Sequence, residues 1–174
     1  REEACEVMAL TVRVTLNGAR ETKGTLPVAF CAFHYFFRRP LTGEMDIVKE
    51  FSKVMPTFGL MHVGVEYLPK AGIEQRDVAH TLIDNGTEFV IGNSPHWVQD
   101  AEVYKGKPIF YSTGNLIFDQ LDTETNRGLN MDVAFTVQYD DNVAKWLALG
   151  ESCKTRRDDC LNKAAEQKLT KVNM

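Results

Sequence analysis

The sequence predicts an α/β fold in which a mostly parallel sheet with flanking helices is extended by antiparallel hairpins. Two observations lead to this fold class. Between residues 27 and 91, short apolar runs alternate with amphipathic segments, which is the strand–helix rhythm of a parallel sheet with right-handed crossovers. After residue 96 the pattern changes to short strand-like segments separated by turn residues, which is typical of β-hairpins.

The first elements follow from the spacing of apolar residues. Residues 11–16 alternate between polar and apolar types and precede an Asn-Gly hairpin signal. Residues 27–33 form a continuous apolar run, as expected of a buried strand. Residues 44–55 place apolar side chains at i, i+3 and i+4, which predicts an amphipathic helix that ends at Pro56.

A second strand–helix–strand unit is predicted next. Residues 58–61 form a short apolar strand, and residues 73–85 have helical spacing. Gly86 stands where a helix C-cap glycine belongs, and residues 88–91 form the following strand. Two such units in succession support the parallel arrangement.

The remaining segments are predicted to add hairpins and a last helix. Residues 158–169 are predicted to form a surface helix within a helical tail over residues 150–174, and the chain as a whole is predicted to be one domain, residues 1–174. The predicted hairpins pair residues 101–104 with 108–112 and residues 130–139 with 143–149.

The composition excludes some classes of function. The chain has 174 residues, is 44% hydrophobic and 25% charged, and carries a net charge of −4. Its basic residues form no stripe that would neutralise phosphates, so we expect no nucleic-acid partner. No apolar run approaches the length of a membrane span. The chain starts with Arg rather than Met, which suggests a piece of a longer protein.

The four cysteines do not form a Cys-x-x-Cys pair, which argues against a structural zinc site. Cys31 lies in an apolar run and is predicted to be a buried thiol. Cys153 and Cys160 either pair, as an oxidising compartment would allow, or both stay reduced.

Two histidines, His62 and His96, each follow an apolar run and begin a loop that contains Gly or Pro. In α/β proteins the functional residues lie in loops beyond the carboxyl ends of the strands. Imidazole is a good ligand for divalent metals and a good proton carrier, and Glu66 would hold the far nitrogen of a ligand histidine. The alternative for His62 is a buried, hydrogen-bonded histidine, and for Glu66 a solvated carboxylate.

The loop before His96 is built to constrain that residue. Gly92 permits a sharp turn and Pro95 fixes the approach to His96. Asn93 and Ser94 are expected to point into the same loop. The alternative reading is a tight turn with a structural role only.

Other polar residues are weaker candidates. Ser112 and Asn115 follow a further apolar run and either line the floor of a site or satisfy the backbone of their own turn. His34 is predicted to pack against neighbouring aromatic residues, and His80 to be a solvated helix residue. The chain contains no Walker loop, no Gly-x-Ser-x-Gly elbow and no Gly-x-Gly-x-x-Gly fingerprint.

Three segments together carry a resemblance to a known family. They read HVGVEY over residues 62–67, GNSPHWVQ over residues 92–99 and YKGKPIFYSTGNLIFDQ over residues 104–120. In order and spacing they resemble the His-Trp-Gly-x-Glu-Tyr, Gly-x-His-Pro-His-Val-x-Gln and Tyr-Ser-Leu-Gly-Asn-Phe motifs of the capsule-synthesis protein CapA family. That family is linked to poly-γ-glutamate production and belongs to the calcineurin-like metallophosphatase superfamily.

The resemblance implies a fold and a metal site. The fold would be part of a metallophosphatase-type four-layer sandwich, and the chain would expose an apolar sheet face where the rest of the sandwich packs. His62 and His96 would be ligands of a divalent metal (Mn, Zn or Fe). Asn93, Gln99, Ser112 and Asn115 would lie around it, with Ser94 in place of a family histidine. The family's amino-terminal Gly-Asp and Asn-His-x-x-Asp segments have no counterpart before residue 60, so the metal would be weakly held.

The resemblance also implies a function in capsule or poly-γ-glutamate biosynthesis, related to metal-dependent phosphoesterases. We expect this chain alone to be inactive, and no catalytic residue can be assigned from the sequence. The alternative is a non-catalytic binding or scaffold domain for an anionic polymer or for the membrane-bound synthesis machinery. A missing amino-terminal half or a dimer partner would complete the fold, and the family resemblance implies an extracytoplasmic or membrane-associated location.

Overall fold

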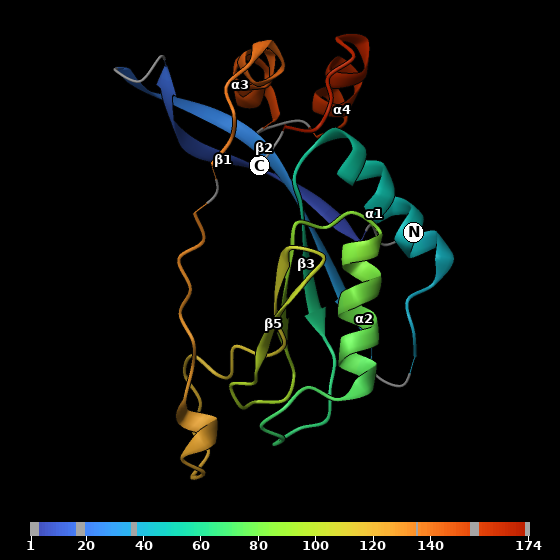
Figure 1. The fold of residues 1–174 in the computed structure, drawn as a ribbon, viewed down its shortest axis with the longest axis vertical. Helices are drawn as coiled ribbons and strands as arrows, with labels where there is room; N and C mark the ends of the chain where they lie inside the picture. Colours follow the sequence, from blue (N-terminus) through green and yellow to red (C-terminus); the bar gives the residue numbers. More distant parts are fainter. Residues whose placement is uncertain (1–3, 17–19, 36–37, 135, 154–156, 173–174) are drawn as a thin grey trace.

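The computed structural model describes residues 4–16, 20–35, 38–134, 136–153 and 157–172. Six strands of this part of the chain form one sheet in the order β1-β2-β3-β4-β6-β5 (Figure 1). In chain order the elements are β1 (Cys5–Leu16), β2 (Arg20–His34), α1 (Thr42–Val54), β3 (Thr57–His62), α2 (Ile73–Asp84), β4 (Phe89–Asn93), β5 (Ala101–Tyr104), β6 (Lys107–Phe110), the 3-10 helix η1 (Glu124–Asn126), α3 (Asp141–Cys153) and α4 (Arg157–Glu166).

The topology confirms the predicted fold class. Strands β2, β3, β4 and β6 pair in parallel, whereas β1 and β5 pair antiparallel with β2 and β6 at the two edges. The predicted Asn-Gly turn between β1 and β2 lies outside the described residues. Gly86 follows α2 with a φ of +109°, which confirms its role as a cap glycine.

The second predicted hairpin is wrong. Residues 143–149 belong to α3, and the described residues of 130–139 form no strand. The reason is the spacing of the large apolar side chains, because Val143, Trp146 and Leu149 recur every three residues and are all buried. Val133 and Tyr139 remain about half exposed. The alternation of polar and apolar residues over 130–139 therefore does not correspond to a strand with one buried face.

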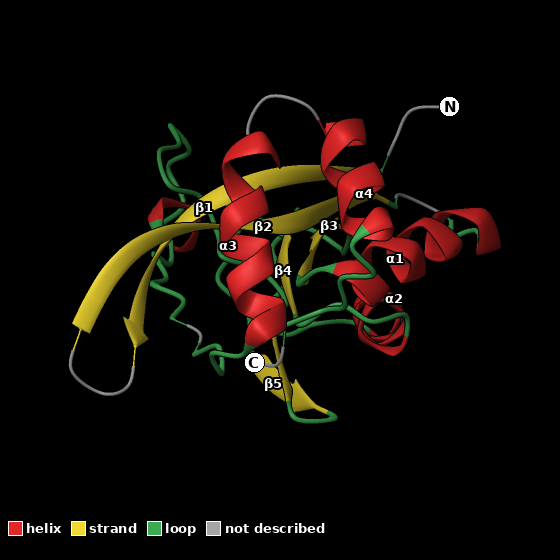
Figure 2. Cartoon of the chain, turned by 90° about the horizontal axis from the view of Figure 1, so that it is seen from above, coloured by secondary structure: helices red, strands yellow, loops and turns green. Residues whose placement is uncertain are grey.

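The helices occupy two places around the sheet (Figures 1 and 2). α1 and α2 lie together beside β3, and α3 and α4 lie over the β1–β2 end. The main core forms on the α1–α2 side and contains Val48 of α1, Leu82 of α2 and Met61 of β3. The carboxyl-terminal residues pack into the same core, because Cys160 of α4 and Val172 are buried.

Two disulfides link neighbouring elements. Cys5 of β1 is bonded to Cys31 of β2, and Cys153 of α3 is bonded to Cys160 of α4. Cys31 is buried as predicted, but the prediction of a free thiol is wrong. The β1–β2 register places Cys5 directly opposite Cys31, and the two open alternatives for Cys153 and Cys160 resolve in favour of the bond.

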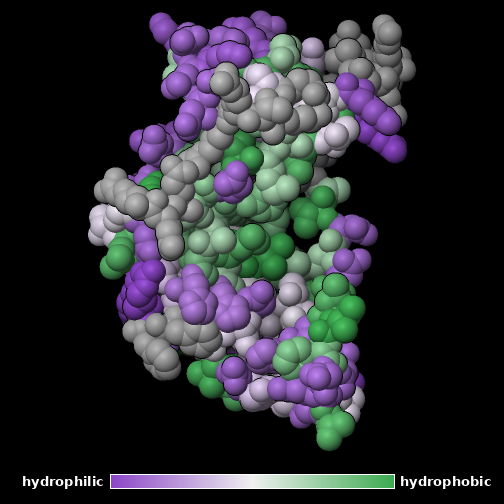
Figure 3. Space-filling view, turned by 180° about the vertical axis from the view of Figure 1, so that it is seen from behind, coloured by the Kyte–Doolittle hydropathy of each residue, from purple (hydrophilic) through white to green (hydrophobic). Residues whose placement is uncertain are grey.

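The sheet side turned away from α1 and α2 carries three rows of side chains, each with one residue from β2, β3 and β4. This side is called the open face below. Its rows are set by strand register, since alternate residues of a strand point to the same side. They are Phe30–Phe58–Phe89, then Ala32–Leu60–Ile91, then His34–His62–Asn93 at the carboxyl ends of the strands. Figure 3 shows hydrophobic residues gathered across the middle of the molecule on the side opposite the view of Figure 1.

The open face should bind a dye that reports apolar surface. Phe30, Leu60 and Ile91 are only partly buried, and a contiguous apolar patch on a soluble protein is a site of association. We expect anilinonaphthalene sulfonate to fluoresce with the folded chain, and Ile91→Lys to reduce that fluorescence roughly twofold. The same change at Val103, which is 72% exposed on β5, should leave it unaltered. A monomer that melts sharply and binds no dye would contradict this expectation.

Candidate functional site

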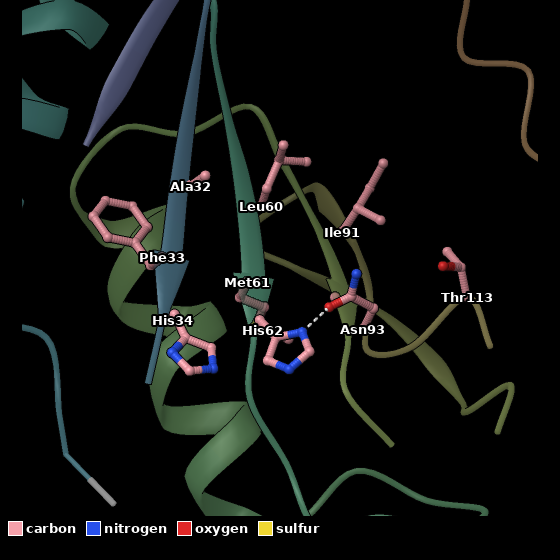
Figure 4. Close-up of a pocket in the computed structure, with 10 residues that line it drawn as sticks. Ala32, Phe33, His34, Leu60, Met61, His62, Ile91, Asn93 and Thr113 are labelled. Atoms are coloured by element: carbon pink, nitrogen blue, oxygen red, sulfur yellow. Dashed lines mark hydrogen bonds between the residues drawn. The ribbon is translucent and has the colours of Figure 1, made fainter. Parts of the chain in front are cut away.

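The carboxyl ends of three parallel strands bring polar side chains together. His34 ends β2, His62 ends β3 and Asn93 ends β4, and the three are paired in register. They line a cavity of about 410 Å³ whose other walls are mainly apolar and include Leu60 and Ile91. Figure 4 shows the polar side chains at one end of this cavity and the aliphatic ones at the other. These polar side chains therefore gather at the carboxyl edge of the parallel strands.

The amide of Asn93 fixes the proton of His62. Asn93 Oδ1 lies 2.6 Å from His62 Nδ1, so this nitrogen carries the hydrogen and donates it to the amide oxygen. A neutral imidazole then has its lone pair on Nε2. His62 is therefore prepared to accept a proton or a metal ion at Nε2, which is the arrangement used by ligand histidines.

Asn115 fixes His96 in the same way. Asn115 Oδ1 lies 3.0 Å from His96 Nδ1, and Asn115 Nδ2 donates to the Thr125 carbonyl at 2.8 Å. That second bond sets the orientation of the amide, so its oxygen must face the histidine and accept from Nδ1. The lone pair of His96 is again left on Nε2.

The Nε2 side of His96 faces Glu66. Glu66 Oε1 lies 3.7 Å from His96 Nε2, and the ring lies between Tyr67 and Phe118, with ring centres 5.7 and 5.1 Å away. The loops that follow β3 and β6 therefore meet around His96. Asn93 is hydrogen-bonded to His62. Asn115 is hydrogen-bonded to His96, and Glu66 lies near it. The predicted residues therefore fall into two groups, one around each imidazole.

Gln99 and Ser112 support the loops of the site. Gln99 is buried, accepts from Gln75 Nε2 at 2.8 Å and donates to the Leu68 carbonyl at 2.9 Å, which ties the loop after β3 to α2. The buried Ser112 hydroxyl accepts from the Gly114 N–H at 3.2 Å. Both side chains form hydrogen bonds with backbone groups. For Ser112 this corresponds to the structural one of the two roles considered from the sequence.

The loop before His96 turns at different residues from those expected. Ser94 and His96 have positive φ angles of 113° and 63°, which cost backbone energy in non-glycine residues. Gly92 is needed for another reason, because a Cβ there would lie 2.2 Å from the Tyr111 carbonyl oxygen. Ser94 is buried and its hydroxyl donates to the Gly64 carbonyl at 3.3 Å, so it holds the two site loops together.

Two histidines have surroundings that the sequence did not predict. His34 is exposed at the end of β2, and its ring centre lies 4.9 Å from that of His62. His80 is not simply solvated, since its Nε2 lies 2.5 Å from Glu102 Oε1. Burial tends to raise the pKa of Glu102, but hydrogen bonds from His80 and Tyr111 together with the charges of His80 and Arg76 hold that pKa below its usual value.

The residues present do not complete the metal centre that the family resemblance implies. Within the described ranges, no three side chains of the His, Cys, Asp and Glu types lie close enough together to hold an ion. His62 and His96 each have the outer hydrogen bond of a ligand histidine, and Glu66 Oε1 lies 3.7 Å from His96 Nε2. The donor set therefore falls short of a two-metal site.

The segment that carries His62 and His96 is similar to a known family. Residues 56–120 match the model of the family described as bacterial capsule synthesis protein PGA_cap. The matched segment contains His62, Glu66, Asn93, His96 and Asn115. His34 lies outside it.

Curated proteins contain segments similar to this part of the chain. The chain is 42% identical over 64 residues to the PGA biosynthesis protein CapA of Bacillus subtilis, a match that covers 37% of this chain and 17% of the relative. The capsule biosynthesis protein CapA of Bacillus anthracis is also 42% identical over 64 residues, which is 37% of this chain and 16% of the relative. A probable polyglutamine synthesis accessory protein of Mycobacterium tuberculosis is 46% identical over 41 residues, 24% of this chain and 11% of the relative. The matches thus span less than a fifth of these relatives.

Proposed function

We propose that this chain acts in the biosynthesis of a bacterial capsule polymer of the poly-γ-glutamate type, as a CapA-like protein. The observation that carries the proposal is that one matched segment, residues 56–120, contains both histidines and the side chains that orient them. The family likeness and the candidate site therefore coincide.

The chemistry that suits this site is proton transfer or metal binding at imidazole Nε2. Both histidines keep that lone pair because an asparagine accepts from Nδ1. A divalent ion would activate water and neutralise charge at a phosphoester. Since the described residues do not complete a metal centre, we propose that Mn, Zn or Fe would need further ligands from outside them before such hydrolysis occurs.

A second candidate is a non-catalytic domain that binds an anionic polymer or the membrane-bound synthesis machinery. The observation in its favour is Ser94, which stands where the family motif has a histidine. Its side chain is buried and bonded to the Gly64 carbonyl. A residue used in this way holds a loop and contributes no imidazole to a metal.

We propose an extracytoplasmic location for this function. The two disulfides support it, because such bonds form and persist in oxidising compartments. Among the helices described, none has both the length and the apolar character to span a bilayer.

A chimera tests the proposed function. Residues 56–120 would replace the matched segment of the Bacillus subtilis relative, and capsule polymer would be measured in cells. We expect polymer to form, and His96→Ala within the chimera to abolish it because the imidazole at the site is lost. Val103→Ala, at a 72% exposed position of β5, serves as the control and should preserve synthesis.

The outcomes separate the two candidates. A chimera that accumulates normally but makes no polymer would overturn the proposed function. Polymer synthesis that survives both His62→Ala and His96→Ala would favour the binding or scaffold candidate, because neither imidazole would then be needed for chemistry.

A further inference from the structure

We propose that the cavity on the open face binds an uncharged, single-chain amphiphile, in which an aliphatic chain ends in a primary amide. This site goes beyond the proposed function, because Glu66, His96 and Asn115 are not among the residues that line the cavity. Binding of this kind needs no metal. The proposal rests on the aliphatic wall of the cavity, on two polar groups at one end of it, and on the absence of charged side chains from its described lining.

The wall of the cavity is aliphatic where three strands lie side by side. Ala32 of β2, Leu60 of β3 and Ile91 of β4 form one row of the open face, and all three line the cavity. Each is exposed or only partly buried. The cavity volume of about 410 Å³ lies in the range of small-molecule sites, which combine apolar walls with a few polar groups. This wall therefore fits a hydrocarbon chain.

Two polar side chains provide hydrogen-bonding groups at one end of the cavity. Asn93 Oδ1 accepts from His62 Nδ1, 2.6 Å away, which leaves the two N–H groups on Asn93 Nδ2 as donors. Figure 4 shows this nitrogen directed toward Ile91, and the Thr113 oxygen directed toward the same space. Within the part of the chain that the structure describes, neither group has a hydrogen-bond partner. Both can therefore bind the head of a ligand.

The backbone holds Thr113 in this place. Its N–H donates to the Gly92 carbonyl at 3.1 Å, and its carbonyl accepts from the Leu129 N–H at 2.8 Å. The hydroxyl of Thr113 can donate or accept a hydrogen bond, whereas Asn93 Nδ2 can only donate. Together they match a head that carries both a carbonyl oxygen and an N–H group, as a primary amide does.

The lining favours an uncharged head over a charged one. No Asp, Glu, Lys or Arg is found among the described residues that line the cavity. A carboxylate or an ammonium group would lose its water there without gaining a side chain of opposite charge, and this costs more than the transfer of a neutral amide that is hydrogen-bonded. The ligand class is therefore that of the primary fatty amides, and fatty acids and fatty amines of equal length should bind less tightly.

Octanamide is the probe, and octanoate and octylamine are its charged counterparts of the same length. In mildly alkaline buffer we expect the whole chain to bind one equivalent of octanamide and to bind either counterpart about tenfold more weakly or less. Hexanamide is shorter by two CH₂ groups, each of which is worth about fourfold in affinity when buried. Calorimetry measures the affinities. The side-chain amide signals of Asn93 in a proton–nitrogen correlation spectrum should shift on binding.

Variants test the two ends of the site. Thr113→Val removes the hydroxyl at nearly constant volume and should weaken octanamide binding about fivefold, whereas Thr113→Ser keeps the hydroxyl and should retain most of the affinity. Ile91→Ala removes part of the aliphatic wall and should weaken binding about tenfold. Val103→Ala, at a 72% exposed position of β5, is the matched control and should bind as the parent chain does. A melting curve for each variant separates lost contacts from unfolding.

Two results would overturn the proposal. One is binding of octanoate or octylamine as tight as that of octanamide, because the apolar surface alone would then account for binding. The other is unchanged octanamide affinity in a folded Thr113→Val chain. This experiment measures binding by the whole chain, whereas the chimera described above measures polymer in cells, so failure of one is distinguishable from failure of the other.

Discussion

Replacing Gly92 with alanine is expected to destabilise the fold by about 3 kcal/mol or more, an effect at the upper end for single substitutions. The added Cβ would lie 2.2 Å from the Tyr111 carbonyl oxygen and 2.9 Å from the Met61 side chain. The first of these atoms is backbone and cannot rotate away. Gly92 also accepts from the Thr113 N–H at 3.1 Å, so the strain would separate β4 from the segment after β6. Denaturant unfolding of both chains measures the loss.

Gly43→Ala provides the matched control. Gly43 lies in the first turn of α1, and nothing stands within 4 Å of the Cβ it would gain. Alanine there should be neutral or stabilise the chain by up to about 1 kcal/mol through helix propensity. If Gly92→Ala unfolded at the same denaturant concentration as the parent, the close approach of β4 to Tyr111 would be wrong, and so would the placement of Asn93 beside His62.

The bond between Cys5 and Cys31 should be the second large contributor to stability. The two residues are 26 positions apart, and closing a loop of that length removes chain entropy from the unfolded state worth about 3.5 kcal/mol. The double change Cys5→Ala with Cys31→Ala should therefore lower the melting temperature strongly. Both side chains are buried, so the small volume lost adds to the effect.

The pair Cys153 and Cys160 gives the comparison. Its separation is only seven positions, so its removal should cost less, about 2.5 kcal/mol. A reducing agent should lower the melting temperature of the parent chain and of each double variant, but have no effect when all four cysteines are replaced. Equal melting temperatures for the parent and the Cys5/Cys31 variant would show that this bond does not form.

The strands that position the site were predictable because each is a short apolar run followed by a polar loop. The sequence placed His62 and His96 after such runs; His62 is the last residue of β3, and His96 lies in the loop after β4. The failure at residues 143–149 has a local cause, since a short apolar segment fits a strand or a buried helix equally well. The three-residue recurrence of Val143, Trp146 and Leu149 was the available signal for the helix.

Other features depend on register, which short-range patterns do not determine. Cys5 faces Cys31 only because Leu16 pairs with Arg20 and the hairpin continues in step from there. The pairing of His34 with His62 likewise depends on the register in which β2 and β3 align. The Asn115–His96 pair joins residues from two separate loops, and no sequence spacing indicates which side of an amide will face a ring.

The three rows of the open face also give the sheet a chemical direction. Along β2, β3 and β4 the side chains of this face change from aromatic rings to aliphatic groups and then to imidazole and amide groups. From Phe58 to His62 this path is four residues long, about 13 Å at the rise of a strand. The face therefore changes from apolar to polar along one direction, and a bound molecule with one apolar and one polar end would be held in a single orientation.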